Sequence, residues 1–374
     1  MNDLDVFAPD STRTREQIKQ LDRLGNDCWQ EQQFAKAEQF WQRAAELAES
    51  LNDLSLMLKE RFWLASMQRM QGKYRQALSV YTWLIEVAYN PQPGHALTEN
   101  DLWYVAGGFM NFVEVGRFLP EMKAADLERV IDRGLDWLAS IGKQDWAAGL
   151  RLKRGGLWHN QGRNEAARAE LEAALALRRR YPNAPGYTLG AYLFQVGYIL
   201  TDMGRLQEAE DYHRQVVAGD EFSQYDKHRS WRELAYIFLR REDFLEAETC
   251  VKQALNLAWT IESLHPISTT YNLLGNIFWK QKQIDKAIEA KIQAWHYARQ
   301  YGEEETLYSI YQDIAELRLD QGQQLSPQRY IPKVRRWLRW ALPLAVRLDR
   351  QVQMTWRQDK IQNLQRQCDE ILKG

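Results

Sequence analysis

Cysteine and proline are scarce in this sequence, and long apolar runs are missing from it. Its 374 residues include 3 cysteines and 10 prolines. Cys28, Cys250 and Cys368 lie far apart, so no two of them have metal-ligand or redox-motif spacing, and their odd number excludes a complete set of disulfides. No run of about 18 apolar residues is present, as a membrane-spanning helix would need. The segment from Met1 to Phe7 lacks the basic and apolar parts of an export signal. We therefore expect a protein of the reducing cytoplasm.

Motifs of catalysis and metal binding are also missing. The 6 histidines are scattered, and no two of them stand four residues apart as metal-binding histidines on one helix would. Gly72-Lys73 and Gly142-Lys143 are not followed by the Ser or Thr of a phosphate-binding loop. No serine lies in a Gly-x-Ser-x-Gly nucleophile turn. We expect neither enzymatic activity nor a metal or other cofactor.

Charge is balanced over the chain but not along it. The formal net charge is -1, which gives the whole molecule no general attraction for nucleic acid or anionic membranes. From Gln323 onward, however, eleven basic residues face four acidic ones, and this tail carries about +7. We favour the interpretation that this tail forms a terminal helix that shields the last helices of the fold. The alternative is that it contacts an anionic membrane or nucleic acid.

Small residues recur along the chain among apolar ones. One series holds Gly25, Gly155, Gly197, Ala235 and Gly275. A second holds Ala37, Ala77, Ala167, Ala209, Ala247 and Ala287. Small residues at such positions allow two antiparallel helices to approach closely, and a larger side chain would force them apart. Because one helix pair cannot bury its apolar face alone, the pairs must stack on one another.

The copies start near residues 18, 58, 101, 148, 190, 228, 268 and 308, about 40 residues apart for most of the chain. The third copy is the most diverged, and Thr98 with Asp101 three residues later predicts a helix cap at its start. We divide the chain into an N-terminal extension (1–17), the repeat array (18–322) and a C-terminal part (323–374). This last part holds the second helix of the last repeat and a capping helix.

The skeleton of Tyr271, Leu274, Gly275, Phe278 and Ala287 resembles the tetratricopeptide repeat, with its Trp, Leu-Gly, Tyr, Gly, Ala, Phe, Ala signature. Units near 40 rather than about 34 residues are similar to those of kinesin light chains, spindle-orientation adaptors, signal-transducing ATPases and Rap-type peptide sensors. The resemblance implies an all-α, right-handed superhelical solenoid of about eight antiparallel helix pairs with a C-terminal capping helix.

The resemblance also implies a groove lined by the first helix of each pair. Mapping the family's groove positions onto this sequence selects Arg229, Arg232, Tyr236, Arg240, Asn272, Asn276, Trp279, Lys280, Phe194, Tyr198, His159 and Asn160. Arginine can pair with carboxylates, and asparagine can both donate to and accept from an extended peptide backbone. We expect none of these polar residues in the core. The alternative is that the arginines are solvated charges neutralised by acidic neighbours.

The third copy places apolar residues on the same nominal face, namely Leu102, Val105, Phe109, Phe112 and Val113. Either they form a pocket for a partner's side chain, or the segment from Gly116 to Ile141 covers them, which we favour. The sequence thus predicts a scaffold or adaptor that binds a protein or peptide, including an acidic or extended one. The alternatives are a regulatory sensor for a small molecule or signalling peptide, and the anionic contact of the tail.

Overall fold

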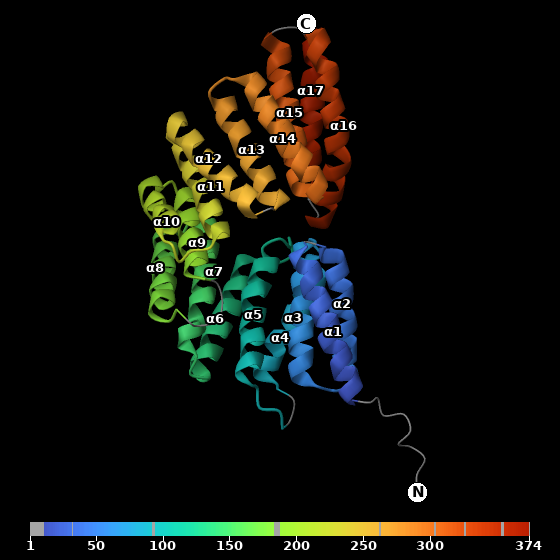
Figure 1. Ribbon diagram of the computed structural model, residues 1–374, viewed down its shortest axis with the longest axis vertical. Coiled ribbons are helices and arrows are strands. Elements are labelled where there is room, and N and C mark those ends of the chain that lie inside the picture. The colour runs from blue at the N-terminus through green and yellow to red at the C-terminus, as the bar shows by residue number, and fades with distance from the viewer. Residues whose placement is uncertain are drawn as a thin grey trace, which may run out of the picture. The chain divides into compact units, whose positions relative to one another are not determined.

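The fold is helical throughout the part of the chain that the structure describes. This computed structural model describes residues 11–31, 33–91, 94–182, 188–261, 263–302, 304–324, 327–352 and 355–373, and no strand occurs among them. The chain divides into two compact units, residues 1–187 and 188–374. Figure 1 labels the helices of both. None of the described helices is long and apolar enough to cross a membrane.

The first unit contains four antiparallel helix pairs. They are α1 (Ser11–Gln30) with α2 (Phe34–Ser50), α3 (Leu54–Met70) with α4 (Tyr74–Tyr89), α5 (Glu99–Gly116) with α6 (Ala124–Ser140), and α7 (Ala148–Asn160) with α8 (Asn164–Arg180). A 3₁₀ helix, η2 (Gln144–Ala147), precedes α7. Helix α1 begins at Ser11, so residues 11–17 are helical rather than part of an extension. Residues 1–10 of the expected extension lie outside the described residues.

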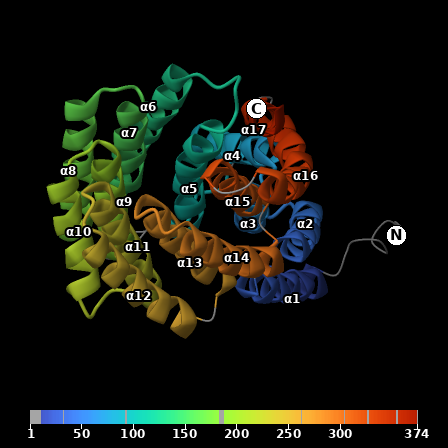
Figure 2. The same cartoon turned by 90° about the horizontal axis from the view of Figure 1, so that it is seen from above.

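The second unit contains four more pairs and a final helix. They are α9 (Leu189–Asp202) with α10 (Leu206–Ala218), α11 (Gln224–Arg240) with α12 (Phe244–Ile261), α13 (Leu264–Lys280) with α14 (Ile284–Tyr301), and α15 (Glu304–Gln324) with α16 (Pro327–Val352). Helix α17 (Trp356–Lys373) packs on α16 and α15. The first helices of successive pairs, α9, α11 and α13, contact one another in that order (Figure 2).

The glycines of the first series lie at the contacts inside their own pairs, as the sequence predicts. All six alanines of the second series are fully buried. A Cβ atom on Gly25, Gly155, Gly197 or Gly275 would lie 2.7 to 2.9 Å from a side chain of the facing helix. In all four pairs that side chain comes sixteen residues later, and the facing residues are Trp41, Leu171, His213 and Lys291. Each glycine therefore makes room for one specific partner.

The turns inside several pairs share one left-handed residue. Gly72, Gly162 and Gly204 have φ between 72° and 79°. At the same place, the two pairs α11/α12 and α13/α14 have Glu242 (φ 62°) and Lys282 (φ 63°). Glycine adopts this region without a steric penalty, whereas side chains with a Cβ adopt it rarely. The two non-glycine turns consequently carry some backbone strain.

The third pair confirms two local predictions. Thr98 caps α5, accepting a hydrogen bond from the Asp101 backbone N–H at 3.2 Å, while the Asp101 side chain accepts one from the Thr98 N–H at 2.8 Å. The apolar residues of this copy are core residues rather than groove residues. Phe109 is fully buried and stacks on Trp137 of α6, with ring centroids 5.7 Å apart. Helix α6 thus covers the apolar face, as we expected.

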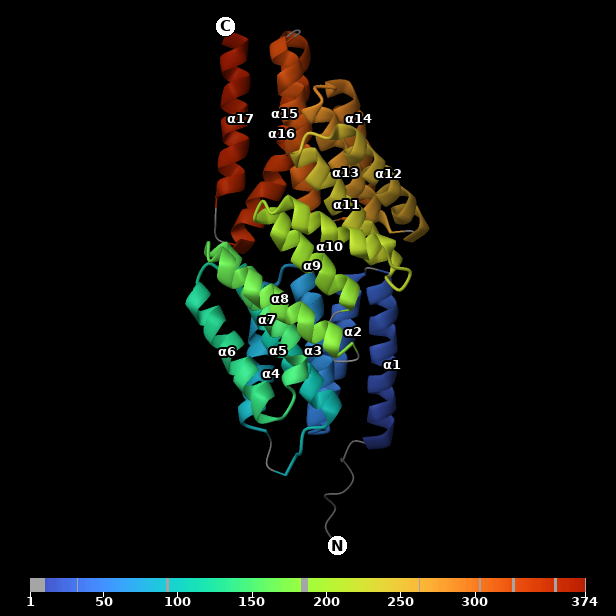
Figure 3. The same cartoon turned by 90° about the vertical axis from the view of Figure 1, so that its left-hand side faces the viewer.

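The end of the second unit is a layer of three helices, α15, α16 and α17 (Figure 3). The apolar side of α16 is buried in their shared cluster, which includes Ile331, Val334, Leu338, Ala341, Leu344, Ala345 and Leu348. Helix α17 adds Ile361, Leu364 and Cys368 to it. Helix α16 therefore serves as the second helix of the last pair, and α17 shields its apolar side.

Candidate functional site

A polar pocket of about 260 Å³ opens on the face formed by α9, α11 and α13. It is lined by Tyr198, Thr201, Asp202, Arg232, Glu233, Tyr236, Thr269, Asn272, Leu273 and Asn276. Five of the twelve residues predicted for the groove are among them, namely Tyr198, Arg232, Tyr236, Asn272 and Asn276. Because successive first helices lie side by side here, residues from three repeats meet in one place.

Beneath the pocket lies a buried lysine that the sequence analysis did not select. The Lys291 side chain on α14 has no exposed area. Its ammonium donates to the side-chain oxygens of Asn272 and Asn276, both at 2.6 Å, and to Asp313 Oδ2 at 2.5 Å. These three acceptors use all three ammonium protons. Burial shifts the pKa of Lys291 downward, and the Asp313 carboxylate opposes that shift.

The lysine fixes the orientation of both asparagines. An ammonium can only donate, so the amide oxygens must face Lys291 and the amide nitrogens must face away from it. No described residue accepts a hydrogen bond from the amide nitrogen of Asn272 or Asn276. Both residues line the pocket. The pocket therefore presents two amide N–H groups whose direction is set from within the protein.

Arg232 and Glu233 bring opposite charges to the same pocket from α11. Both are partly buried, and the Arg232 Nε atom is buried without a hydrogen-bond partner. Burial lowers the pKa of Arg232 below its ordinary value, while Glu233 counteracts that effect. Burial likewise raises the pKa of Glu233, and Arg232 and Arg229 oppose it. A ligand that supplied a hydrogen-bond acceptor would satisfy a buried donor at this position.

Three other predicted residues of the second unit lie beside the pocket without lining it. Phe194 is only 6% exposed, because the Arg229 guanidinium covers its ring 3.6 Å from the centroid. Arg240 donates from Nη1 to the carbonyl oxygen of Thr201 at 2.7 Å, near the end of α9. The same carbonyl also accepts the Gly204 backbone N–H at 3.1 Å. Arg229 and Arg240 thus join α11 to α9, and Phe194 is not accessible to a partner.

Trp279 and Lys280 lie at the end of α13, away from the pocket. The Trp279 indole donates to Asp320 Oδ2 at 3.1 Å. It lines a second pocket of about 290 Å³ between α13, α15 and α17, where Lys360 pairs with Glu316 at 3.2 Å. Lys280 is exposed. Among the predicted groove residues of the second unit, Trp279 therefore lines a different hollow from the five that line the α9–α11–α13 pocket.

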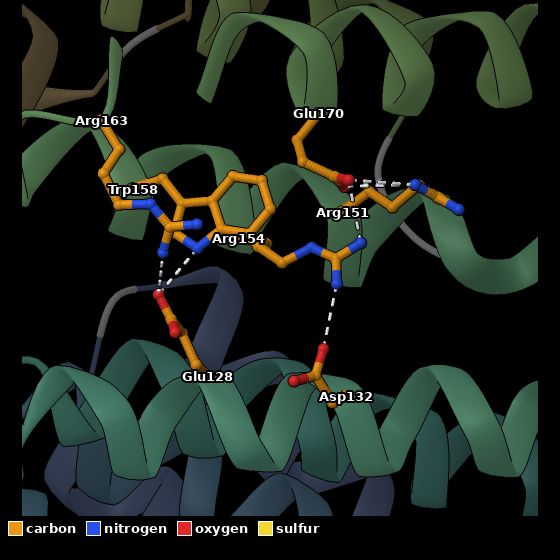
Figure 4. A network of polar contacts seen from close by, with 7 residues as sticks. All are labelled: Glu128, Asp132, Arg151, Arg154, Trp158, Arg163 and Glu170. Atoms are coloured by element: carbon orange, nitrogen blue, oxygen red, sulfur yellow. Dashed lines mark hydrogen bonds and ion pairs between the residues drawn. The ribbon is translucent and has the colours of Figure 1, made fainter. Parts of the chain in front are cut away.

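The first unit contains a charged network between α6, α7 and α8 (Figure 4). Arg154 donates to Asp132 at 3.0 Å and to Glu170 Oε1 at 2.9 Å. Arg151 donates to the same Glu170 carboxylate at 3.2 and 3.3 Å. Opposite charges are matched within the network, and its contacts hold three helices together. We therefore interpret it as structural.

The same network continues toward the end of α7. His159 and Asn160, the two predicted groove residues of the first unit, lie there. Trp158 and Arg163 both donate to Glu128 Oε1, at 2.7 and 2.9 Å, and the Arg163 guanidinium lies 4.2 Å from the Trp158 ring (Figure 4). Next to Trp158, His159 contacts the Asn164 side-chain oxygen through Nδ1 at 3.2 Å. Asn160, the last residue of α7, is exposed. His159 and Asn160 belong to the first unit, whereas the α9–α11–α13 pocket belongs to the second.

Metal binding has no support in the described ranges. No group of three or more His, Cys, Asp or Glu side chains there is arranged to hold a metal ion. The three cysteines are free thiols, and two of them, Cys250 and Cys368, are buried. Burial raises the pKa of Cys250 to about 12, so this thiol is a poor nucleophile. The α9–α11–α13 pocket itself offers hydrogen-bonding and charged side chains.

Comparisons with known proteins agree with this architecture. Residues 195–219 and 268–293 match two family models, each described as a tetratricopeptide repeat. A Rap protein complexed with Competence and Sporulation Factor is similar in structure, with a TM-score of 0.51 and 14% identity over 96% of this chain and 99% of that one. The apo form of RapI has a TM-score of 0.51 and 12% identity over 82% and 80%.

A thermophilic TPR protein of Thermus thermophilus is also similar, with a TM-score of 0.42 and 20% identity over 59% of this chain and 99% of that one. No curated protein matches the sequence. At these identities the likeness concerns the fold. The predicted family resemblance and the predicted helical-repeat fold are confirmed.

Proposed function

Because this chain carries tetratricopeptide repeats, we propose that it is a non-catalytic, cytoplasmic binding protein. Its α9–α11–α13 pocket would hold an extended segment of a protein or peptide. The observation that carries this proposal is the pair of asparagines oriented by Lys291. Both asparagines and Arg232, whose Nε is buried without a hydrogen-bond partner, line one pocket that has few apolar atoms to offer.

The chemistry of the pocket favours a peptide backbone over a strongly acidic ligand. Asn272, Asn276 and Arg232 offer donors, while Glu233 offers a carboxylate. An extended backbone carries both carbonyl oxygens and N–H groups, so it can satisfy both kinds of group. A segment with many carboxylates would be repelled by Glu233. Exposed Tyr198 and Tyr236 flank the pocket and can cover apolar side chains of the segment.

A short signalling peptide is the form of this ligand that the structural comparison supports. A Rap protein with a similar fold carries the Competence and Sporulation Factor in its structure. If the ligand of this chain is a free peptide, the protein acts as a sensor. If it is a segment of a folded protein, the protein acts as an adaptor. The same residues would bind both.

The test is capture of partners from native lysate on immobilised full-length chain, with identification by mass spectrometry. Arg232→Gln and Tyr236→Ala should each lose the partner. Tyr225→Ala is the matched control, because Tyr225 lies on the same helix, is 46% exposed against 43% for Tyr236, and does not line the pocket. Retention of the partner by both pocket variants, or its loss in the control as well, would refute this site.

A further inference from the structure

The outward face of α16 carries charge of one sign. Every exposed charged residue on this helix is basic, namely Arg329, Lys333, Arg335, Arg336, Arg339, Arg347 and Arg350. Its one acidic residue, Asp349, is fully buried and accepts hydrogen bonds from Arg357 at 3.1 Å and from the Gln358 backbone N–H at 3.0 Å. The only anion of α16 is thus turned inward and neutralised.

Two of the seven cations are paired with carboxylates. Arg335 lies 2.5 Å from Asp369, and Arg347 lies 2.8 Å from Glu304. The other five have no carboxylate partner among the described residues, and we call them the basic stripe: Arg329, Lys333, Arg336, Arg339 and Arg350. Their spacings of three, four and eleven residues return to the same side of a helix. At 1.5 Å per residue the stripe is about 30 Å long.

Aromatic rings hold part of the stripe in place without cancelling its charge. The Arg336 guanidinium lies 4.8 Å from the Trp340 ring centroid, and Lys333 lies 5.0 Å from that of Tyr330. Trp340 in turn stacks on Trp295 of α14. A cation over a ring keeps its full charge, unlike a cation in a salt bridge. Because the rings already restrict these side chains, less side-chain conformational entropy is lost when an anion binds.

Two features decide which polyanion fits. An interfacial membrane helix inserts its apolar side into the lipid, but the apolar side of α16 is buried in the cluster with α15 and α17. Four of the five stripe residues are arginines, whose planar, forked guanidinium matches phosphate oxygens. A row of separate arginines about 30 Å long fits a phosphate chain.

We propose that the basic stripe of α16 binds the phosphodiester backbone of nucleic acid, independently of base sequence. This contact is separate from the pocket on α9, α11 and α13. With five cations, log K should fall against log salt with a slope of about -4.5. The affinity should therefore drop about 500-fold between 50 and 200 mM salt.

The experiment is fluorescence anisotropy of labelled duplex DNA, titrated with the full chain at increasing salt. A duplex of about 20 base pairs is twice the length that the stripe spans, at 3.4 Å per base pair. Arg339→Gln/Arg350→Gln removes two stripe cations that have no hydrogen bond, ion pair or ring contact with other described residues, so the fold should be unchanged. The slope should become shallower by about 1.8.

Arg335→Gln/Arg347→Gln is the matched control, because it removes the same formal charge from α16 but from residues already paired with carboxylates. It should leave the slope unchanged. Equal effects of the two double variants would overturn the stripe as the contact. So would the absence of duplex binding at low salt, or retention only by vesicles of phosphatidylcholine and phosphatidylserine.

Discussion

Lys291 occupies the space that Gly275 leaves open by having no side chain. A Cβ atom on Gly275 would lie 2.8 Å from Lys291 Cε and 2.9 Å from its Cδ and Cγ. The long stem of the lysine therefore passes close to the backbone of α13 and ends beneath the pocket, where its buried ammonium meets the two asparagines. Because Gly275 has no side chain, Lys291 can extend from the core of this repeat to the asparagines that line the α9–α11–α13 pocket.

Gly275→Ala should destabilise the protein by about 1–3 kcal/mol, because the new methyl group overlaps the lysine stem. Chemical denaturation measures the loss. The neighbouring repeat supplies a compensating variant, since Ala235 and Val251 stand at the equivalent positions and both are fully buried. Gly275→Ala/Lys291→Val should recover most of the stability while losing the pocket ligand. A double variant as unstable as the single one would contradict the steric explanation.

Asn272→Ala should cost about 1.5–3 kcal/mol, the usual contribution of a hydrogen bond to a charged group. This revises the expectation from sequence that the asparagine is independent of the fold. The cost should shrink in the Lys291→Met background, where no ammonium needs the amide oxygen. A double-mutant cycle by denaturation measures the coupling between the two residues. Additive effects would show that the Asn272–Lys291 contact contributes nothing.

Glu60→Gln should make the protein more stable above neutral pH. Glu60 on α3 is fully buried, its carboxylate has no hydrogen-bond partner, and Lys59 Nζ lies 3.4 Å away while bonding Asp22. Burial raises the pKa of Glu60 to about 7. The folded state therefore holds a proton between pH 4.5 and 7 that the unfolded state has lost, so stability falls as the pH rises through that window.

The expected gain for Glu60→Gln is about 3 kcal/mol at pH 8 and little at pH 4. Melting temperatures measured across this range provide the test. Glu46→Gln, on the exposed surface of α2, is the control. Parallel pH profiles for wild type and Glu60→Gln would show that Glu60 does not ionise in this window.

His213→Leu should reduce the sensitivity of the protein to acid. His213 is fully buried against Gly197, and burial lowers its pKa to about 3. Between pH 6.5 and 3 the unfolded state binds a proton that the folded state does not, so stability falls as the pH falls. At pH 5 this costs about 2 kcal/mol relative to neutral pH. Leucine fits, because Leu171 fills the equivalent position against Gly155.

Denaturation at about pH 7.5 and about pH 5 measures the His213 effect. His228, whose pKa burial also lowers to about 3, should leave a loss of similar size in place. His296→Leu on the exposed side of α14 is the control. If wild type and His213→Leu lose the same stability on acidification, the histidine is not held neutral in the fold.

Helix pairs and caps could be predicted from the sequence because their signals are local. The six alanines and four glycines mark the contact inside a pair wherever the pair lies in the chain, and Thr98 with Asp101 marks a helix start within four residues. The covering of Phe109 by α6 was the favoured of two alternatives that the apolar pattern left open. Each of these predictions depends on residues that are close in sequence or on residues with small side chains. Tertiary packing rarely overrides such signals.

The candidate site could be predicted only in part because it depends on contacts between helices. Arg232, Asn272 and Asn276, which the groove positions selected, line one pocket, but nothing near Arg240 in the sequence indicates that it donates to Thr201 of the preceding repeat. Lys291 was missed because a lysine in a helix is normally a solvated residue. Only its sixteen-residue offset from Gly275 marks it as buried.

That offset locates, from the sequence of this chain, polar side chains that are buried inside a helix pair. The residue sixteen places after Gly25, Gly155, Gly197 and Gly275 is in turn an aromatic side chain (Trp41), an aliphatic one (Leu171), a neutral imidazole (His213) and a cation (Lys291). A substitution at that one position therefore changes the charge buried inside a repeat, while the glycine that makes room for it and the helix pair around it stay the same.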